Sequence, residues 1–101
     1  MKDVNELLKE LVVIKRSGQR VPFNGGKIAL AIKKGFDSVY EDTDEKEVNK
    51  VYLKVVSVIE KEYADRKTIK IEDIQDIIED TLQKMKYDDV YKEFSSYRER
   101  R

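Results

Sequence analysis

Residues 12–28 have the sequence VVIKRSGQRVPFNGGKI, in which two short apolar runs flank a turn that contains Gly18. The two runs, 11–15 and 20–23, are predicted to be the strands of a hairpin, because Gly18 supplies the positive φ that a tight turn often needs. Pro22 has no N–H group to donate to a neighbouring strand, so the second strand is expected to lie at a sheet edge or to end early. This stretch therefore predicts a small hairpin at the start of the domain.

Four cationic or polar side chains surround this hairpin. Lys15 and Arg16 stand at the end of the first strand. Asn24, a good N-cap, and Lys27 stand in the first turn of a predicted helix, where N–H groups are unpaired and the helix dipole favours anions. The side chains between them are apolar and offer a surface on which a base can stack: Val13, Val21, Phe23 and Ile28. The layout can hold a phosphorylated ligand whose other end is apolar, and the absence of a Walker A sequence indicates a site of another type.

The rest of the chain predicts four helices, because apolar residues recur at helical spacing in four successive segments. These residues are Ile28, Ile32 and Phe36 in the first segment, Val48, Val51, Tyr52, Val55, Val56, Ile59 and Tyr63 in the second, Ile71, Ile74, Ile77, Ile78, Leu82 and Met85 in the third, and Val90, Tyr91, Phe94 and Tyr97 in the fourth. Thr68–Lys70 can form a minimal third strand. The predicted fold class is α+β, with an N-terminal β-hairpin capping a four-helix bundle.

Local signals mark where these helices begin and end. Gly35 and the acidic stretch 37–44 are expected to end the first helix. Asp44 with Glu47 resembles a capping box before the second helix, although that motif properly begins with Ser or Thr. The segment 87–89 is expected to separate the last two helices.

A length of 101 residues fits one domain, with a short helical lead-in over 1–11 and a main domain over 12–101. Lys and Arg number 21, as do Asp and Glu, and this balance argues against binding nucleic acid through bulk charge. The chain has no Cys and no His, which excludes disulfides, zinc–thiolate sites and the commonest general base. No catalytic or metal-binding residue is therefore assigned, and the chain is not expected to be an enzyme.

The start of the chain, residues 1–6, lacks an apolar signal core. No segment approaches the length and apolarity of a membrane span. The sequence therefore predicts a soluble cytoplasmic protein with no membrane partner.

Four segments, in this order, carry a resemblance to a known family. They are Val13-x-Lys15-Arg16-x-Gly18, Val21-Pro22-Phe23-Asn24-x-x-Lys27-Ile28, Ile69-x-Ile71-x-Asp73-Ile74-x-Asp76 and Tyr91-x-x-Phe94-x-x-Tyr97-Arg98-x-x-Arg101. Together they resemble, over residues 12–101, the ATP-cone domain. This nucleotide-sensing module occurs at the N-terminus of many ribonucleotide reductase large subunits and in the repressor of reductase genes. The resemblance implies that the chain binds ATP or dATP as an allosteric signal without hydrolysis. It also implies a change in oligomeric state, as a homo-oligomer, or in contacts with a ribonucleotide reductase core.

The resemblance further implies which residues bind the triphosphate. Lys15 and Arg16 would contact it, Lys27 would reach a phosphate, and Arg98 would close over the phosphates. Mg²⁺ is expected to accompany the nucleotide, held mainly by phosphate oxygens and water.

For the adenine, the resemblance implies a contact from Asn24 at the edge of the base. Val13 and Ile28 would line the base pocket. Val21 stands where some members of the family have a carboxylate that meets the base, so adenine selectivity is expected to depend more heavily on Asn24.

The same residues also allow simpler interpretations. Lys15 and Arg16 can form a solvated turn, Asn24 can be an N-cap without a ligand, and Arg98 can belong to a frayed basic end. The alternative function is a nucleic-acid-binding, transcription-linked module that uses the basic hairpin. This chain has no Cys and so lacks the zinc ribbon that carries DNA contact in the repressor, which makes nucleic acid the less favoured partner.

Overall fold

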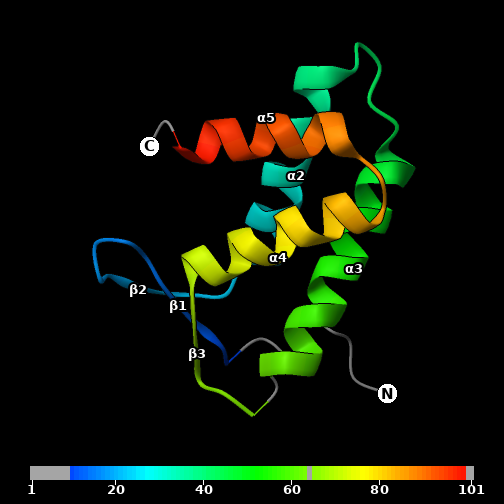
Figure 1. Ribbon diagram of the computed structural model, residues 1–101. Coiled ribbons are helices and arrows are strands. Elements are labelled where there is room, and N and C mark those ends of the chain that lie inside the picture. Colours follow the sequence, from blue (N-terminus) through cyan, green and yellow to red (C-terminus); the bar gives the residue numbers. More distant parts are fainter. Residues whose placement is uncertain (1–9, 64, 100–101) are drawn as a thin grey trace.

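The structure is a computed structural model that describes residues 10–63 and 65–99, with side chains as far as Ser96. Within these residues the elements follow the order β1 (Val12–Ile14), β2 (Arg20–Pro22), α2 (Gly25–Val39), α3 (Glu45–Tyr63), β3 (Thr68–Lys70), α4 (Ile71–Lys84) and α5 (Asp88–Glu99) (Figure 1). A small sheet together with four helices confirms the predicted α+β class. The predicted lead-in helix lies outside the described residues, apart from its last two positions.

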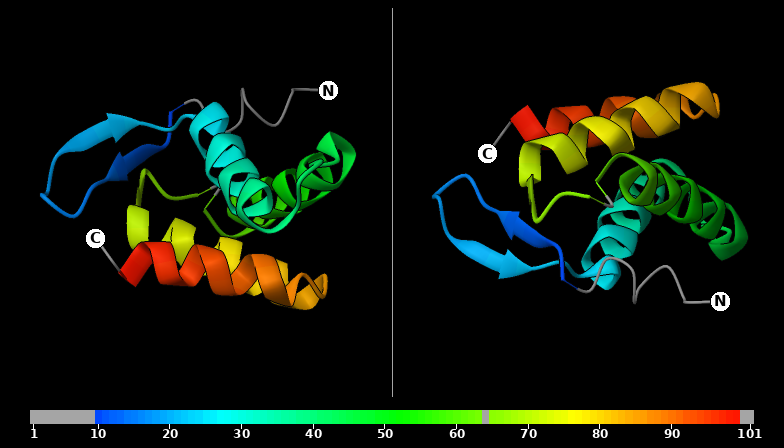
Figure 2. Two further views of the ribbon diagram at one scale, coloured as in Figure 1. Left: turned by 90° about the horizontal axis from the view of Figure 1, so that it is seen from above. Right: turned by 90° about the horizontal axis from the view of Figure 1, so that it is seen from below.

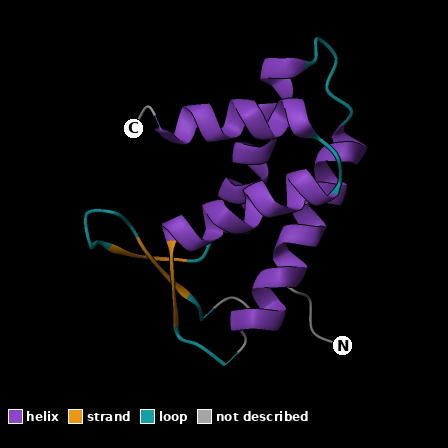
Figure 3. Cartoon of the chain, in the orientation of Figure 1, coloured by secondary structure: helices purple, strands orange, loops and turns teal. Residues whose placement is uncertain are grey.

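The three described strands form one sheet in the order β2-β1-β3 (Figure 3). β1 pairs antiparallel with β2, where Val13 is opposite Val21, and parallel with β3, where Val13 is opposite Ile69. The minimal third strand at Thr68–Lys70 is therefore present, and it places β1 in the middle of the sheet. β2 is an edge strand, as its Pro22 predicts.

The hairpin loop closes through two backbone hydrogen bonds of 2.8 Å. Gly18 N donates to Lys15 O, and Lys15 N donates to Gln19 O. Gly18 has a φ of +89°, which confirms the predicted need for glycine in this turn. In two views the hairpin projects beyond the helices, on the side where α4 begins and α5 ends (Figure 2).

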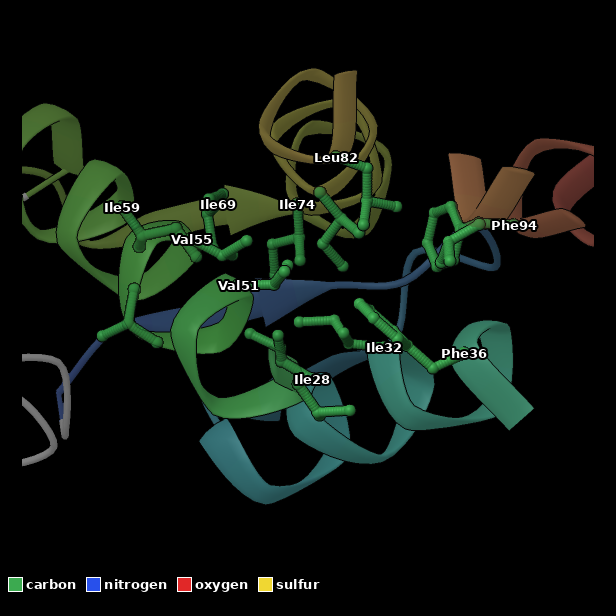
Figure 4. Close-up of a cluster of buried hydrophobic side chains, with 14 of the residues drawn as sticks. Ile28, Ile32, Phe36, Val51, Val55, Ile59, Ile69, Ile74, Leu82 and Phe94 are labelled. Atoms are coloured by element: carbon green, nitrogen blue, oxygen red, sulfur yellow. The ribbon is translucent and has the colours of Figure 1, made fainter. Parts of the chain in front are cut away.

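One hydrophobic core joins the sheet to the four described helices, and its side chains point into a common interior (Figure 4). Ile32 of α2, Val51 of α3, Leu82 of α4 and Val90 of α5 are fully buried. Val13 of β1 is buried with them, so the central strand is anchored in the helical core. This anchoring fixes where the hairpin stands relative to α2 and α4. Every helix within 10–63 and 65–99 is too short or too polar to span a bilayer.

Asn24 caps α2 as predicted, because its Oδ1 accepts a hydrogen bond of 2.9 Å from Gly26 N. The helix ends at Val39, within the acidic stretch 37–44 that is expected to end it, but it continues past Gly35. Gly35 is buried instead, and a Cβ at this position would lie 3.2 Å from Val90 Cγ1 of α5. Glycine at 35 thus permits α2 and α5 to approach closely.

The break between α4 and α5 lies slightly earlier than predicted. Lys86 has a φ of +67°, and the carbonyls of Gln83 and Leu82 accept hydrogen bonds from Lys86 N and Tyr87 N at 3.0 and 2.8 Å. These two bonds form a Schellman motif that ends α4. Asp88 and Asp89 belong to the first turn of α5 rather than to the break, because carboxylates are favourable at a helix N-terminus.

The capping box predicted at the start of α3 forms only in part. Asp44 Oδ1 accepts a hydrogen bond of 2.9 Å from Lys46 N, as an N-cap side chain does. The Glu47 carboxylate accepts a hydrogen bond from the hydroxyl of Tyr87. Glu47 thereby links the start of α3 to the α4–α5 turn.

Candidate functional site

A cavity of about 770 Å³ opens between the hairpin, α2, α4 and α5. Its volume lies within the range of typical small-ligand sites. The residues that line it come from the hairpin and its exit (Val13, Lys15, Val21, Pro22, Phe23), from the α2 cap and α2 (Asn24, Lys27, Ile28, Leu30, Ala31, Lys34, Gly35, Asp37, Ser38), from α4 (Ile71, Ile74, Gln75, Ile78) and from α5 (Glu93, Phe94, Ser96). Residues far apart in the chain therefore enclose one space.

Five of the seven predicted site residues line this cavity: Val13, Lys15, Asn24, Lys27 and Ile28. Arg16 is not among the lining residues. Its Nε lies 3.6 Å from Glu72 Oε1 at the start of α4, with 46% of the Arg16 side chain and 55% of the Glu72 side chain exposed. Arg98 lies in α5, but its side chain is outside the described part of the structure.

One wall of the cavity is apolar. Val13 and Ile28 are buried, and Val21 and Phe23 are half-buried beside them. Ile74 and Phe94 add apolar surface from α4 and α5. This wall can receive a flat, weakly polar group such as a nucleobase.

The N-terminus of α2 gives the cavity a positive end. The first turn of α2 has no acidic residue, whereas α3, α4 and α5 each carry two acidic residues there. The partial positive charge of the helix start is therefore not offset on α2, and Lys27 in this turn adds to it. Lys15 lines the same cavity from the end of β1. An anion such as a phosphate is favoured at this end.

Asn24 can serve both the fold and a ligand. The N-cap uses its Oδ1, which accepts the hydrogen bond from Gly26 N. The Nδ2 amide group on the same side chain carries two hydrogens that the cap does not use. The two interpretations of Asn24, an N-cap or a ligand contact, are therefore compatible through different atoms.

Gln75 is a cavity residue that the sequence reasoning missed. Its Oε1 is buried and has no hydrogen-bond partner among the described residues. Buried acceptors in folded proteins usually have a hydrogen-bond partner, so this oxygen can accept from a donor in the cavity. A signal was present in the sequence: Gln75 lies four residues after Ile71 and three before Ile78, so it belongs to the face of α4 that is otherwise apolar.

The far end of the cavity carries mixed charge. Lys34, Asp37 and Ser38 line it from the later turns of α2, and Glu93 lines it from α5. Lys27 and Asp37 are separated by about 15 Å along the helix axis. The described residues contain no cluster of three or more acidic side chains that would hold a metal ion by themselves.

Lys33 lies on a different surface from Lys15, Lys27 and Lys34, which line the cavity. It lines a separate groove between α2 and α3, and its Nζ lies 3.6 Å from Glu45 Oε1. Lys27 and Lys34 of α2 thus line the cavity, whereas Lys33 lines a groove on another face of the same helix. Lys33 therefore offers a matched control for the lysines of the cavity.

Comparison with known proteins agrees with this geometry. Residues 11–101 match the family described as the ATP cone domain. The vitamin B12-dependent ribonucleoside-diphosphate reductase of Thermoplasma acidophilum is 38% identical over 100 residues, which cover 94% of this chain and 12% of the reductase. The ribonucleoside-diphosphate reductase subunit alpha of Chlamydia muridarum is 35% identical over 100 residues, which cover 92% of this chain and 10% of that subunit. The chain thus spans about a tenth of the length of these relatives, and by these matches it belongs to the ATP-cone domain family.

Proposed function

We propose that the cavity binds ATP or dATP as a regulatory effector. The observation that carries this proposal is the union, in one cavity, of an apolar wall, of Lys27 at a helix N-terminus that has no acidic residue in its first turn, and of Lys15 from the end of β1. ATP-cone domains bind ATP or dATP as allosteric effectors, which supports a nucleotide-sensing regulatory role for this chain.

In this proposal the phosphates lie at the positive end of the cavity. Lys15 and Lys27 contact the phosphates directly, and Arg16 and Arg98 reach them from the hairpin loop and the end of α5. Charged donors of this kind form the strongest hydrogen bonds to phosphate oxygens. Mg²⁺ binds with the nucleotide through phosphate oxygens and water.

The adenine lies against the apolar wall between Val13 and Ile28. The Nδ2 group of Asn24 donates to an acceptor on the edge of the base. Gln75 Oε1 accepts from a nucleotide N–H or O–H group, which would satisfy an oxygen that has no protein partner in the described residues. The donors and acceptors of the cavity thus fit a nucleotide.

The proposed consequence of binding is a change in oligomeric state or in contacts with a ribonucleotide reductase core. Nucleotide can shift such an equilibrium only as far as its affinities for the two states differ. Size-exclusion chromatography in ATP and in dATP would test this step. An elution volume identical in both nucleotides and in their absence would argue against a change in self-association.

Calorimetry with ATP and dATP tests the binding itself. We expect Lys15→Ala to weaken binding by roughly tenfold or more, because it removes a charge-assisted contact to phosphate. Lys33→Ala removes the same charge from the neighbouring groove and is expected to leave the affinity nearly unchanged. No binding of either nucleotide at millimolar concentration to the unmodified protein would refute the proposed function.

A further inference from the structure

The ion pair between Arg16 and Glu72 stands at the edge of the cavity. Lys15 and Ile71, the chain neighbours of these two residues, both line the cavity. The pair joins the hairpin loop to the first turn of α4, which lie on the same side of the molecule (Figure 2). Arg16 thus pairs with a carboxylate of the protein, although the position proposed for the phosphates lies beside Arg16.

A guanidinium group binds carboxylates and phosphates through the same N–H donors. An Arg16 side chain that is paired with Glu72 therefore has fewer donors to offer a phosphate. Glu72 itself is favourably placed in the first turn of α4, where the helix dipole stabilises a negative charge. The Glu72 carboxylate and a phosphate would therefore use the same donors of Arg16.

We propose that Glu72 competes with the nucleotide for Arg16 and so sets the nucleotide concentration at which the cavity fills. This inference rests on the proposed function, since it requires that a polyphosphate binds beside Lys15. Before binding, Arg16 is held by Glu72 outside the cavity. On binding, the guanidinium leaves Glu72 for a phosphate oxygen, and both side chains have enough exposed surface to make this exchange.

The test is the ATP affinity of Glu72→Gln. We expect this variant to bind ATP roughly two- to fivefold more tightly, the range that the loss of one exposed ion pair can produce. AMP has a single phosphate and so offers fewer oxygens that can draw Arg16 away from Glu72, and its affinity is expected to change less than that of ATP. Glu41→Gln removes an equal charge from the exposed loop between α2 and α3 and is expected to change neither affinity.

A second variant separates competition from simple repulsion between Glu72 and the nucleotide. In an Arg16→Ala background, competition predicts that Glu72→Gln gives no gain in ATP affinity, because no guanidinium remains to be released. An equal gain in both backgrounds, or no gain in either, would overturn the inference. If the unmodified protein binds ATP and Glu72→Gln does not strengthen binding, only this inference fails. If the unmodified protein binds no nucleotide, the proposed function fails with it.

Discussion

The hydroxyl of Tyr87 donates a hydrogen bond to Glu47, and its ring packs edge-on against Phe36 with 5.1 Å between the ring centroids. The hydrogen bond to Glu47, together with burial and nearby negative charge, raises the pKa of Tyr87 to about 12. The hydrogen bond links residues 40 positions apart in the sequence and ties the start of α3 to the end of α4. The loss of this one hydrogen bond should therefore change the free energy of unfolding of the domain.

Tyr87→Phe is expected to lower the free energy of unfolding by about 1–2 kcal/mol near neutral pH, because it removes a hydrogen bond to a charged carboxylate. The folded-state pKa of Tyr87 lies above the unfolded value of about 10. The contribution of the tyrosine is therefore fully present below pH 10 and is lost as the pH rises towards 12. Urea unfolding of the wild type and the variant at several pH values should show their difference shrinking over this interval.

The Glu47→Gln background provides the control for this prediction. An amide replaces the charged acceptor there, so the effect of Tyr87→Phe should be smaller. A difference between wild type and Tyr87→Phe that stayed constant up to pH 12 would show that the hydrogen bond does not hold the proton on Tyr87.

Lys86 adopts a left-handed backbone conformation that glycine would adopt without strain. Lys86→Gly is expected to raise the free energy of unfolding by up to about 1 kcal/mol, because the Schellman motif at the end of α4 favours glycine at this position. Gln83→Gly in the last turn of the same helix should lower it by about 1 kcal/mol. Chemical denaturation of both variants would measure the two changes, and destabilisation by Lys86→Gly would mean that the lysine side chain contributes more than its backbone costs.

The sequence predicted those features of the strands and helices that depend on residues close together in the chain. The hairpin turn at Gly18 and the start of α2 at Asn24 are determined within a few positions, and both are confirmed. The role of Gly35 could not be predicted, because the reason for it is Val90, a residue on another helix. The parallel pairing of β1 with β3 likewise depends on segments separated by two helices, so the third strand could only be suggested.

The contact between α2 and α5 predicts a coupling between Gly35 and Val90. Gly35→Ala gains helix propensity of about 1 kcal/mol but places its Cβ 3.2 Å from Val90 Cγ1, so the two effects oppose each other. In a Val90→Ala background the close contact is absent, and the same substitution should be more favourable by about 1 kcal/mol. Thermal or urea unfolding of the wild type, the two single variants and the double variant would measure this coupling, and strict additivity would contradict the close packing of the two helices.

The candidate site also depends on residues that are far apart in the chain and could not be predicted together. Lys15, Asn24 and Lys27 lie within one short stretch, and local pattern was enough to place them together. Gln75 and Glu72 lie on α4, some fifty positions later, and only the fold brings them to the hairpin. The sequence pattern therefore predicted the side of the cavity that the hairpin and α2 form, but it did not predict the contribution of α4.

Because the walls of the cavity come from both ends of the described chain, a bound nucleotide should stabilise the domain as one unit. Ligand that binds only the folded state at about 100 times its dissociation constant adds about 2.7 kcal/mol to the free energy of unfolding. We expect ATP to raise the urea midpoint with little change in the slope of the transition, as for a two-state domain. Lys15→Ala should need roughly tenfold more ATP for the same shift, whereas Lys33→Ala should follow the wild type. If calorimetry showed binding but the midpoint did not move, the nucleotide would have to bind outside the cooperatively folded core, and the cavity between the hairpin, α2, α4 and α5 could not be its site.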